Sequence, residues 1–512
     1  MKNGIIPVVA GITHPSTDLT LREALRDLKR PIRTGDATAP ALLPESLGDP
    51  EFLREHRVRY AYATGAMANG IASAALVEAG AKAGLLSFFG AAGLAPDRVE
   101  AEIVKLKSAL GDAPHGFNLI HSPSESSLEN AVCDLYLRRG VRLVEASAFM
   151  GLTPAIVRYR LNGIRRGTNG GIEAPNKVVA KISRTEVAEK FLSPAPDTML
   201  REMAAAGLIT AEQAELGASI PMAQDVTVEA DSGGHTDNRP LVSLLPAIIS
   251  LRDRLQDKYR FAMTPRVGAA GGISTPASVA AAYQMGAAYV LTGSINQACV
   301  ESGSSDQVRK MLAAAGQADV AMAPAADMFE LGVKVQILKR GTMFAMRGAK
   351  LYEVYRAYDS IEAIPAAVRA PLERDLFREP LEAVWEKTRA FFLQRDPSQV
   401  ERAEKDPKHK LALVFRSYLG QASRWANAGV ADRVLDYQVW CGPAMGAFNE
   451  WAQGSFLQTP ENRRAALVAR NLLYGAAVLT RAHFLRCQGV VLPADAVRIE
   501  PLSHEELDRH LN

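Results

Sequence analysis

The sequence predicts a mixed α/β fold: a (β/α)8 barrel preceded by an N-terminal extension and followed by a mostly helical domain. Three observations lead to this prediction. Short apolar runs alternate with helix-like segments through residues 56–303, two glycine-rich turns lie about twenty residues apart near the end of that region, and the alternation stops after Gly303. Alternating β and α elements are typical of parallel sheets, so we favour a barrel over a sandwich or a bundle. An open, doubly wound sheet is the main alternative.

Residues 1–55 are interpreted as an extension ahead of the barrel. They are rich in proline and charge, and one short helix is expected from Leu19 to Lys29. The pattern changes at about Arg57, where the short apolar runs begin. The barrel is therefore placed at residues 56–303.

Eight apolar runs are the candidate barrel strands. They are Tyr60–Thr64, Gly84–Phe89, Gly116–Ile120, Leu143–Ser147, Val178–Ile182, Asp225–Glu229, Arg266–Ala269 and Ala288–Leu291. Between them lie segments with helical periodicity. Val99–Leu110 repeats apolar residues at helical spacing, and Pro276–Met285 opens with a serine, a threonine and a proline suited to the first helical position.

Residues 304–512 are interpreted as a mostly helical domain packed on the barrel, with a lid over the barrel as one possible role. Amphipathic stretches run from Leu372 to Leu393, from Lys410 to Ala428 and from Asn462 to Cys487. The sequence leaves open whether this domain closes the barrel, covers it or forms an interface.

Composition and charge argue against several classes of protein. The chain has 59 Lys and Arg against 56 Asp and Glu, a net charge of +3, which gives no case for a nucleic-acid partner. Its four cysteines are far apart, so neither a metal site nor a disulfide framework is indicated. No apolar stretch reaches the length of a membrane span or a secretory signal. We expect an unprocessed cytoplasmic protein with no membrane partner, for which a homo-oligomer is possible.

The two glycine-rich turns, Val267–Pro276 and Val290–Ser294, predict a phosphate site. Each follows a candidate strand, and their spacing fits one helix and one return strand, so they would lie side by side. Glycine is needed because a Cβ would keep backbone N–H groups from closing on phosphate oxygens. The expected ligand is a phosphorylated cofactor.

A second candidate site is the segment Val228–Asp237, which follows the sixth candidate strand. Gly233 and Gly234 let the backbone turn beneath a ligand, and His235 would project over it. Histidine donates or accepts protons near neutral pH. An ordinary surface loop with a solvated histidine is the alternative.

Earlier strand ends supply further polar groups. The small-residue turn Thr64–Gly70 either passes under a flat ring or is only a tight turn. Asn118 and Lys181 each interrupt an apolar run, and a polar group in a buried strand needs a partner. For Lys181 that partner is either a ligand, which we favour, or a buried ion pair with Glu145 or Glu229.

The segment Arg158–Asn169 carries four arginines beyond the fourth candidate strand. The planar fork of arginine suits phosphate groups, so this segment could meet a nucleotide phosphate or a phosphopantetheine-bearing carrier protein. An ordinary surface loop explains it equally well.

The order of the motifs resembles the nitronate monooxygenase superfamily. The motifs are Thr64–Gly70, Gly116–Asn118, Glu229–His235, Ala270–Ile273 and Leu291–Ser294. That superfamily holds FMN-dependent barrels, among them flavin-type enoyl-acyl-carrier-protein reductases. The run from Glu229 to Asp237, the run from Leu291 to Gln297 and the long helical tail are most similar to the PfaD family, enoyl reductases of bacterial polyunsaturated fatty acid synthases and of some polyketide synthases. The resemblance extends from about Pro44 onward.

The resemblance implies a cofactor, a reductant and a partner. FMN would be bound, NADPH would reduce it, and the substrate would be an enoyl thioester on an acyl carrier protein of a polyunsaturated fatty acid or polyketide synthase. His235 would be the catalytic residue, as proton donor or carbonyl partner. The implied cofactor-binding residues are Ala66, Met67, Asn118, Lys181, Glu229, Gly233, Gly234, Gly271, Gly272, Gly293 and Ser294, with the phosphate on the last four.

Two other functions remain open from the sequence. A nitronate monooxygenase uses the same flavin but passes electrons to oxygen. A non-catalytic subunit would bind the flavin only as part of a synthase scaffold. The long tail favours the reductase, because a carrier-protein client needs a docking surface and a small-molecule oxidase does not.

Overall fold

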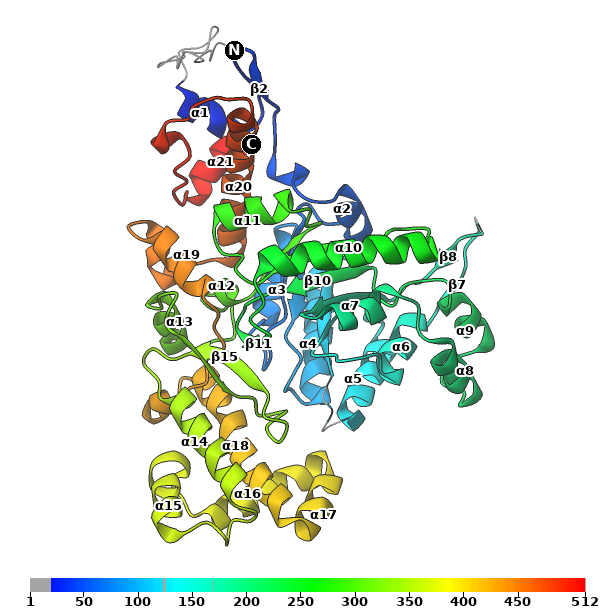
Figure 1. Cartoon of the computed structure of the whole chain (residues 1–512), viewed down its shortest axis with the longest axis vertical. Helices are drawn as coiled ribbons and strands as arrows, with labels where there is room; N and C mark the ends of the chain where they lie inside the picture. The colour runs from blue at the N-terminus through cyan, green and yellow to red at the C-terminus, as the bar shows by residue number, and fades with distance from the viewer. Residues whose placement is uncertain (1–19, 122, 124–125, 169, 512) are drawn as a thin grey trace, which may run out of the picture.

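Eight parallel strands form a closed barrel ringed by helices (Figure 1). The computed structural model describes residues 20–511 except 122, 124–125 and 169. The barrel strands are β3 (Tyr62–Thr64), β4 (Leu86–Phe89), β5 (His115–Ile120), β6 (Leu143–Ser147), β9 (Lys177–Ile182), β10 (Asp225–Glu229), β12 (Arg266–Ala270) and β13 (Val290–Thr292). They pair in the order β10-β12-β13-β3-β4-β5-β6-β9 and close on β10. The ring confirms the predicted barrel and excludes the open sheet.

Helices on the outside connect the strands. They are α3 (Ala74–Lys82), α4 (Pro96–Leu110), α5 (Ser126–Arg139), α6 (Pro154–Leu161), α7 (Thr185–Leu192), α8 (Asp197–Ala205), α9 (Ala211–Gly217), α10 (Leu241–Tyr259), α11 (Pro276–Gln284) and α12 (Ser294–Gln297), with a small hairpin of β7 (Arg165–Arg166) and β8 (Ile172–Glu173). Helix α4 buries Val99, Ile103 and Leu106, the periodic residues that predicted it. Helix α11 begins as expected, with Thr275 as its N-cap and Pro276 at the first position.

Helix α20 (Ala465–Cys487) completes the ring of helices although it comes from the C-terminal region. The helix that follows β13, α12, has four residues and is too short to cover the seam between β13 and β3. Helix α20 packs instead against α11 and α3, on either side of that seam. Gly475 permits the approach, because a Cβ there would lie 2.6 Å from the Cβ of Pro276. Residues 304–464 are therefore inserted between the last strand and the last helix of the barrel.

The N-terminal segment packs beside α20. It comprises α1 (Leu21–Arg26), β1 (Ile32–Thr34), β2 (Ala37–Ala39), η1 (Pro44–Ser46) and α2 (Pro50–His56). The fully buried Arg481 of α20 donates hydrogen bonds to the backbone carbonyls of Ala24, Leu25 and Asp27. The first helix is shorter than the stretch predicted from Leu19 to Lys29, and Leu19 lies outside the described residues. The C-terminal helix thus holds the N-terminal segment in place.

A three-stranded antiparallel sheet joins the His235 loop to the segment that follows the barrel. Strand β11 (Gly234–His235) pairs with β15 (Lys334–Leu338), and β15 pairs with β14 (Val320–Pro324). The sequence predicted only helix-rich structure after Gly303 and did not predict β14 or β15. This sheet fixes the backbone of His235 from outside the barrel.

The remaining helices include a distinct helical lobe, which we define as α14 to α18 with η2 and η3, at the bottom of Figure 1. Its elements are α14 (Phe344–Ala357), α15 (Ala366–Pro371), the π-helix η2 (Leu372–Phe377), α16 (Leu381–Arg395), α17 (Pro397–Lys405), α18 (Pro407–Ala428) and η3 (Ala431–Asp436). Outside the lobe lie α13 (Asp306–Ala313), α19 (Ala444–Ala452), η4 (Phe456–Gln458), η5 (Pro460–Asn462), η6 (Ala494–Ala496) and α21 (His504–Leu511). The three predicted amphipathic stretches correspond to η2 with α16, to α18 and to α20. The lobe has its own apolar core, which includes Leu381, Trp385 and Phe415.

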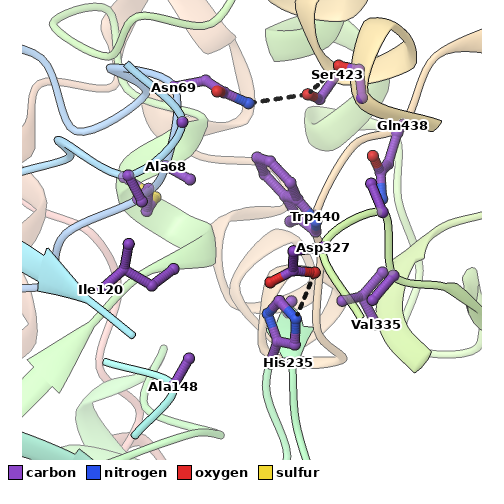
Figure 2. Close-up of a pocket in the computed structure, with 18 of the residues that line it drawn as sticks. Ala68, Asn69, Ile120, Ala148, His235, Asp327, Val335, Ser423, Gln438 and Trp440 are labelled. Carbon is purple, nitrogen blue, oxygen red and sulfur yellow. Dashed lines mark hydrogen bonds and ion pairs between the residues drawn. The ribbon is translucent and has the colours of Figure 1, made fainter. Parts of the chain in front are cut away.

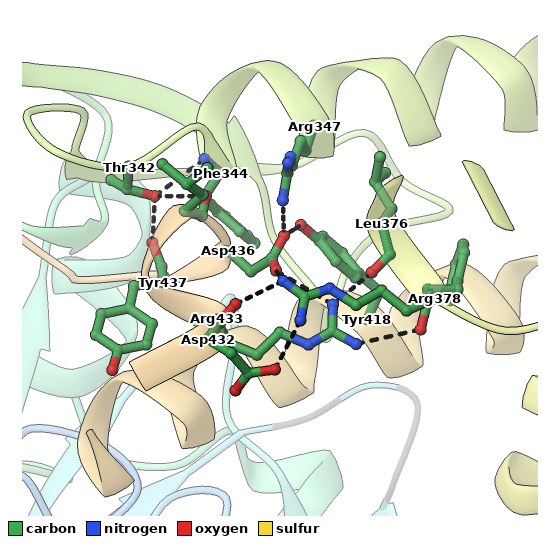
Figure 3. A network of polar contacts seen from close by, with 12 residues as sticks. Thr342, Phe344, Arg347, Leu376, Arg378, Tyr418, Asp432, Arg433, Asp436 and Tyr437 are labelled. Carbon is green, nitrogen blue, oxygen red and sulfur yellow. Dashed lines mark hydrogen bonds and ion pairs between the residues drawn. The ribbon is translucent and has the colours of Figure 1, made fainter. Parts of the chain in front are cut away.

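One buried carboxylate ties the helical lobe together (Figure 3). Asp436 is fully buried and accepts hydrogen bonds from the Tyr418 hydroxyl at 2.5 Å and from Arg433 at 3.2 Å. Arg347 of α14 also donates to it, and Arg378 lies 3.7 Å away. A buried charge is tolerated only when it is paired, so this cluster fixes α14, α18 and η3 relative to one another.

A second buried ion cluster lies at the amino end of the barrel strands. Asp225 is fully buried and accepts hydrogen bonds from Arg266 Nε at 2.6 Å and Nη2 at 3.0 Å. His56 Nε2 lies 2.8 Å from Asp225 Oδ2, the oxygen that also accepts from Arg266 Nη2. Asp225 and Arg266 are register partners on β10 and β12, so the cluster fixes these two strands and α2.

Neither membrane spans nor metal clusters are found in the described part of the chain. Among its helices, none combines the length and apolar character needed to cross a bilayer. Its His, Cys, Asp and Glu side chains form no group of three or more suited to a metal ion. Cys133, Cys299, Cys441 and Cys487 are all free thiols.

Candidate active site

A cavity of about 750 Å³ lies over the carboxyl ends of the barrel strands. The loops that follow the strands form one side of it, and α16 and α18 of the helical lobe form the other. Figure 2 shows barrel residues such as Ala68 and Ile120 facing Gln438 and Trp440 across it. The structure brings all twelve sequence-predicted site residues to this cavity: Ala66, Met67, Asn118, Lys181, Glu229, Gly233, Gly234, His235, Gly271, Gly272, Gly293 and Ser294.

Charged residues at the strand ends form the floor of the cavity. Lys181 Nζ and Glu229 Oε1 form an ion pair at 2.8 Å. Burial would lower the pKa of Lys181, but the carboxylates of Glu229 and Glu145 outweigh it and raise that pKa. Of the two partners that the sequence left open for Lys181, the ion pair is therefore present. The lysine also lines the cavity, so its predicted contact with a ligand stays a prediction.

Glu145 of β6 organises the turn after β3. Its Oε2 accepts a hydrogen bond from the Ala66 N–H at 2.9 Å, and it is fully buried. Its Oε1 has no hydrogen-bond partner in the described part of the chain, and burial raises the pKa of Glu145 to about 7. Asn118 Nδ2 donates to the Glu145 carbonyl oxygen and to Ser147 Oγ, both at 3.0 Å. These contacts hold two predicted ligand-binding residues on the cavity floor.

The glycine turns after β12 and β13 leave backbone open to the cavity. Gly271 and Gly272 have positive φ angles of 85° and 74°, a conformation that favours glycine. A Cβ at Gly271 would lie 2.6 Å from the Ala230 carbonyl carbon, whereas no described atom lies within 4 Å of a Cβ at Gly272 or Gly293. The turns therefore form a cradle that side chains at Gly272 and Gly293 would fill. Such a cradle fits the phosphate of the cofactor that the sequence implies.

His235 lines the cavity from the loop that follows β10. Its Nε2 lies 3.2 Å from Asp327 Oδ1, as the dashed line in Figure 2 shows. Burial would lower the pKa of His235, but the Asp327 carboxylate outweighs it and raises that pKa above its ordinary value. The two glycines before His235 are needed for different reasons. A Cβ at Gly233 would lie 2.8 Å from the Cys441 backbone N, so this position requires a close approach of two backbones. Gly234 faces open space, but its φ of 85° favours glycine. The His235 side chain is 36% exposed, and the pairing with Asp327 at the cavity favours a site residue over an ordinary surface loop.

Removing the Asp327 charge is expected to lower the pKa of His235. In Asp327→Asn the ring loses the carboxylate that favours its protonated form. A raised folded-state pKa adds stability that is complete below the unfolded pKa of about 6.5 and is lost as pH rises through the folded value. NMR titration of the His235 ring in both proteins measures the shift, and the ring of His115, outside the cavity, is the internal control. An unchanged His235 pKa would show that the pair is not electrostatically coupled.

The arginine-rich segment is not part of the cavity. Arg158 pairs with Asp134, Arg165 with Glu173 and Arg166 with Glu215. Arg160 is buried and donates to the Asn176 carbonyl oxygen at 2.5 Å. Asn169 lies outside the described residues. All four arginines thus have protein partners, which favours the ordinary surface segment over the phosphate site.

The C-terminal region contributes cavity residues that sequence reasoning missed. Asp327, Phe391, Arg424 and Trp440 all line the cavity but lie after residue 303, where the sequence shows no chemical motif. Asn69 Nδ2 donates to Ser423 Oγ at 2.9 Å and connects the turn after β3 to α18 across the cavity (Figure 2). The C-terminal region therefore forms a wall of the site.

Comparison with known proteins places this fold and site in a family. Residues 55–370 match the nitronate monooxygenase family, and residues 358–437 match the inserted helical domain of acyl-carrier-protein S-malonyltransferase. One polyunsaturated fatty acid synthase subunit from a Thraustochytrium species is 49% identical over 464 residues, which cover 89% of this chain and 31% of that protein. Polyketide biosynthesis protein PksE of Bacillus subtilis is 45% identical over 436 residues, which cover 85% of this chain and 56% of that protein.

Among solved structures, the enoyl reductase domain of MlnA from the macrolactin biosynthesis cluster of Bacillus amyloliquefaciens is similar, with 36% identity and a TM-score of 0.81. The match covers 88% of this chain and 100% of that domain. The chain spans 31% of the length of the synthase subunit and 56% of the length of PksE. These matches confirm the resemblance seen in the sequence: the chain belongs to the nitronate monooxygenase family and, within it, to the PfaD group.

Proposed function

We propose that the chain is an FMN-dependent, NAD(P)H-consuming enoyl reductase. It acts in trans, in the cytoplasm, on enoyl thioesters carried by acyl carrier protein domains of a polyunsaturated fatty acid or polyketide synthase. One observation carries the proposal: both an open glycine cradle and the His235–Asp327 pair line a single cavity. The enoyl reductase domain of MlnA, similar in fold and sequence, supports the same reaction class.

The barrel residues would hold the cofactor. Gly271, Gly272, Gly293 and Ser294 would receive its phosphate, because their backbone borders open space at the strand ends. The Lys181–Glu229 pair would lie against the polar edge of its ring and ribityl chain. FMN bound there and reduced by NAD(P)H would supply the hydride that reduces the β-carbon of a 2-enoyl thioester.

His235 would hold the proton that the α-carbon needs. Its Nε2 is engaged by Asp327, so Nδ1 is the ring atom left to donate to substrate. The raised pKa keeps more of the imidazole protonated near neutral pH than an isolated ring would be. The walls from α16 and α18 would limit the access of water and oxygen to the reacting atoms.

A nitronate monooxygenase is the second candidate, because the matching family model carries that description. That model ends at residue 370, so the α16 and α18 wall of this cavity lies beyond it. Two parallel assays separate the functions: oxygen consumption with a nitroalkane and NADPH oxidation with an enoyl thioester. We expect turnover only in the second assay, and turnover only in the first would overturn the proposal.

Filling the glycine cradle is expected to abolish FMN binding. In Gly272→Val, a side chain occupies the open space and the positive φ of 74° adds strain of about 1–2 kcal/mol. Gly207→Val is the matched control, because Gly207 has a φ of 68°, equally open surroundings and no place in the cavity. FMN retained after gel filtration should be lost in the first variant only. Equal retention in both would remove Gly272 from the cofactor site.

A further inference from the structure

The cavity wall formed by the helical lobe carries four cations. Lys387 and Arg395 come from α16, and Arg416 and Arg424 come from α18. Three of them, Lys387, Arg395 and Arg416, interact with other groups of the protein. Lys387 Nζ pairs with Glu379 at 2.5 Å, and Arg416 donates to the Ala326 carbonyl oxygen at 2.8 Å and lies 3.4 Å from Glu330.

Arg424 differs from these three, because it has no hydrogen bond or acidic partner in the described part of the chain. Its guanidinium carbon lies 5.8 Å from the centre of the Phe391 ring, and that of Arg395 lies 5.6 Å from the same ring. Two guanidinium groups thus share one aromatic side chain at the cavity wall. An anion bound beside Arg424 would compensate its charge and relieve its repulsion from Arg395.

The electrostatic state of Arg424 agrees with this interpretation. Arg424 is exposed to solvent, but the protein around it partly desolvates the guanidinium and lowers its pKa, and the like charge of Arg395 lowers that pKa further. A guanidinium keeps its charge at neutral pH in spite of such a shift. The protein thus maintains an uncompensated positive charge beside a second arginine on the wall of the cavity.

We propose that Arg424, with Arg395, forms a subsite for the phosphate group of a substrate that enters the cavity. Arginine forks match phosphate oxygens bidentately, and Phe391 supports both forks. The phosphate group could come from either of two reactants, and this choice rests on the proposed function. One is the 4′-phosphopantetheine arm of a carrier protein, and the other is NADPH, through its 2′-phosphate. The arginines of the segment Arg158–Asn169 do not provide this phosphate site, because they are paired with other groups of the protein.

Equilibrium binding tests this subsite without requiring turnover. Calorimetry would compare 4′-phosphopantetheine with pantetheine, and NADP⁺ with NAD⁺, on the purified full-length chain. In one of these two comparisons, the wild-type protein should bind the phosphate-bearing compound more tightly, and that comparison identifies the reactant that uses the subsite. Arg424→Ala should reduce that preference by about tenfold to hundredfold, as expected for loss of charge-assisted hydrogen bonds. Arg395→Ala should also weaken the preference for the phosphate-bearing compound in that comparison.

Arg165→Ala is the matched control, because Arg165 is exposed, pairs with Glu173 and does not line the cavity. It should leave both preferences unchanged. Absence of a phosphate preference in both comparisons, or a preference that survives Arg424→Ala, would overturn the subsite. An Arg424-dependent preference in a chain that reduces no enoyl thioester would uphold the subsite and overturn the proposed function.

Discussion

Replacing His235 with alanine is expected to lower the turnover of enoyl thioester by about 10²- to 10⁴-fold while bound flavin is retained. The variant removes the group that would protonate the α-carbon and leaves every residue of the glycine cradle in place. Reduction of the flavin by NADPH should proceed at the wild-type rate. Stopped-flow absorbance resolves that step from its reoxidation by the enoyl thioester, so the loss should appear only in the second step.

His504→Ala is the matched control for this experiment. His504 also forms an ion pair with an aspartate, Asp508, at 2.9 Å, but it is exposed and lies in α21 away from the cavity. It should turn over substrate at the wild-type rate. Unchanged turnover in His235→Ala would remove His235 from the mechanism. Loss of flavin together with activity would assign it to cofactor binding instead.

Asp225→Asn is expected to destabilise the fold by about 3–5 kcal/mol, because it leaves the buried Arg266 charge without its partner. Burial opposes the charge of Asp225, but His56 and Arg266 outweigh it and lower the pKa of Asp225 to about 2. Stability from this carboxylate is therefore complete above its unfolded pKa of about 3.9 and is lost as pH falls toward 2. The difference between wild type and variant in urea unfolding should be constant from about pH 5 to 8 and should shrink in acid.

Glu173→Gln is the control for the Asp225 variant. It breaks the exposed ion pair with Arg165 on the β7–β8 hairpin and should cost at most about 1 kcal/mol. Flavin content should be unchanged in folded Asp225→Asn, since Asp225 lies at the end of the barrel opposite the cavity. Equal destabilisation in the two variants would show that the buried cluster adds nothing beyond a surface pair.

The barrel could be predicted from the sequence because its signals are local. Each strand is a short apolar run, and its bounds in the structure differ from the predicted ones by at most two residues. Glycines and polar residues at strand ends converge because all eight strands are parallel and end at the same face. That topology alone brings Gly272, Lys181 and His235 to one cavity.

The parts that could not be predicted depend on contacts between distant segments. Asp327 reaches His235 from 92 positions later in the chain, held by the pairing of β11 with β15. Strand β11 has two residues, too few for any periodicity to show. The sequence pattern places helix α20 in the C-terminal domain. No residue pattern within the helix shows that it covers the seam left by the short α12. Its Gly475, unusual within a helix, is the one local sign of a close approach.

The absorbance spectrum of the purified protein, recorded without oxygen, tests the central claim most directly. We expect a flavin spectrum that bleaches when NADPH is added and recovers when an enoyl thioester follows, because one cavity holds both the cradle for FMN and the proposed proton donor. A colourless protein that neither copurifies with FMN nor takes it up would contradict the account, as would a reduced flavin that the enoyl thioester leaves unchanged.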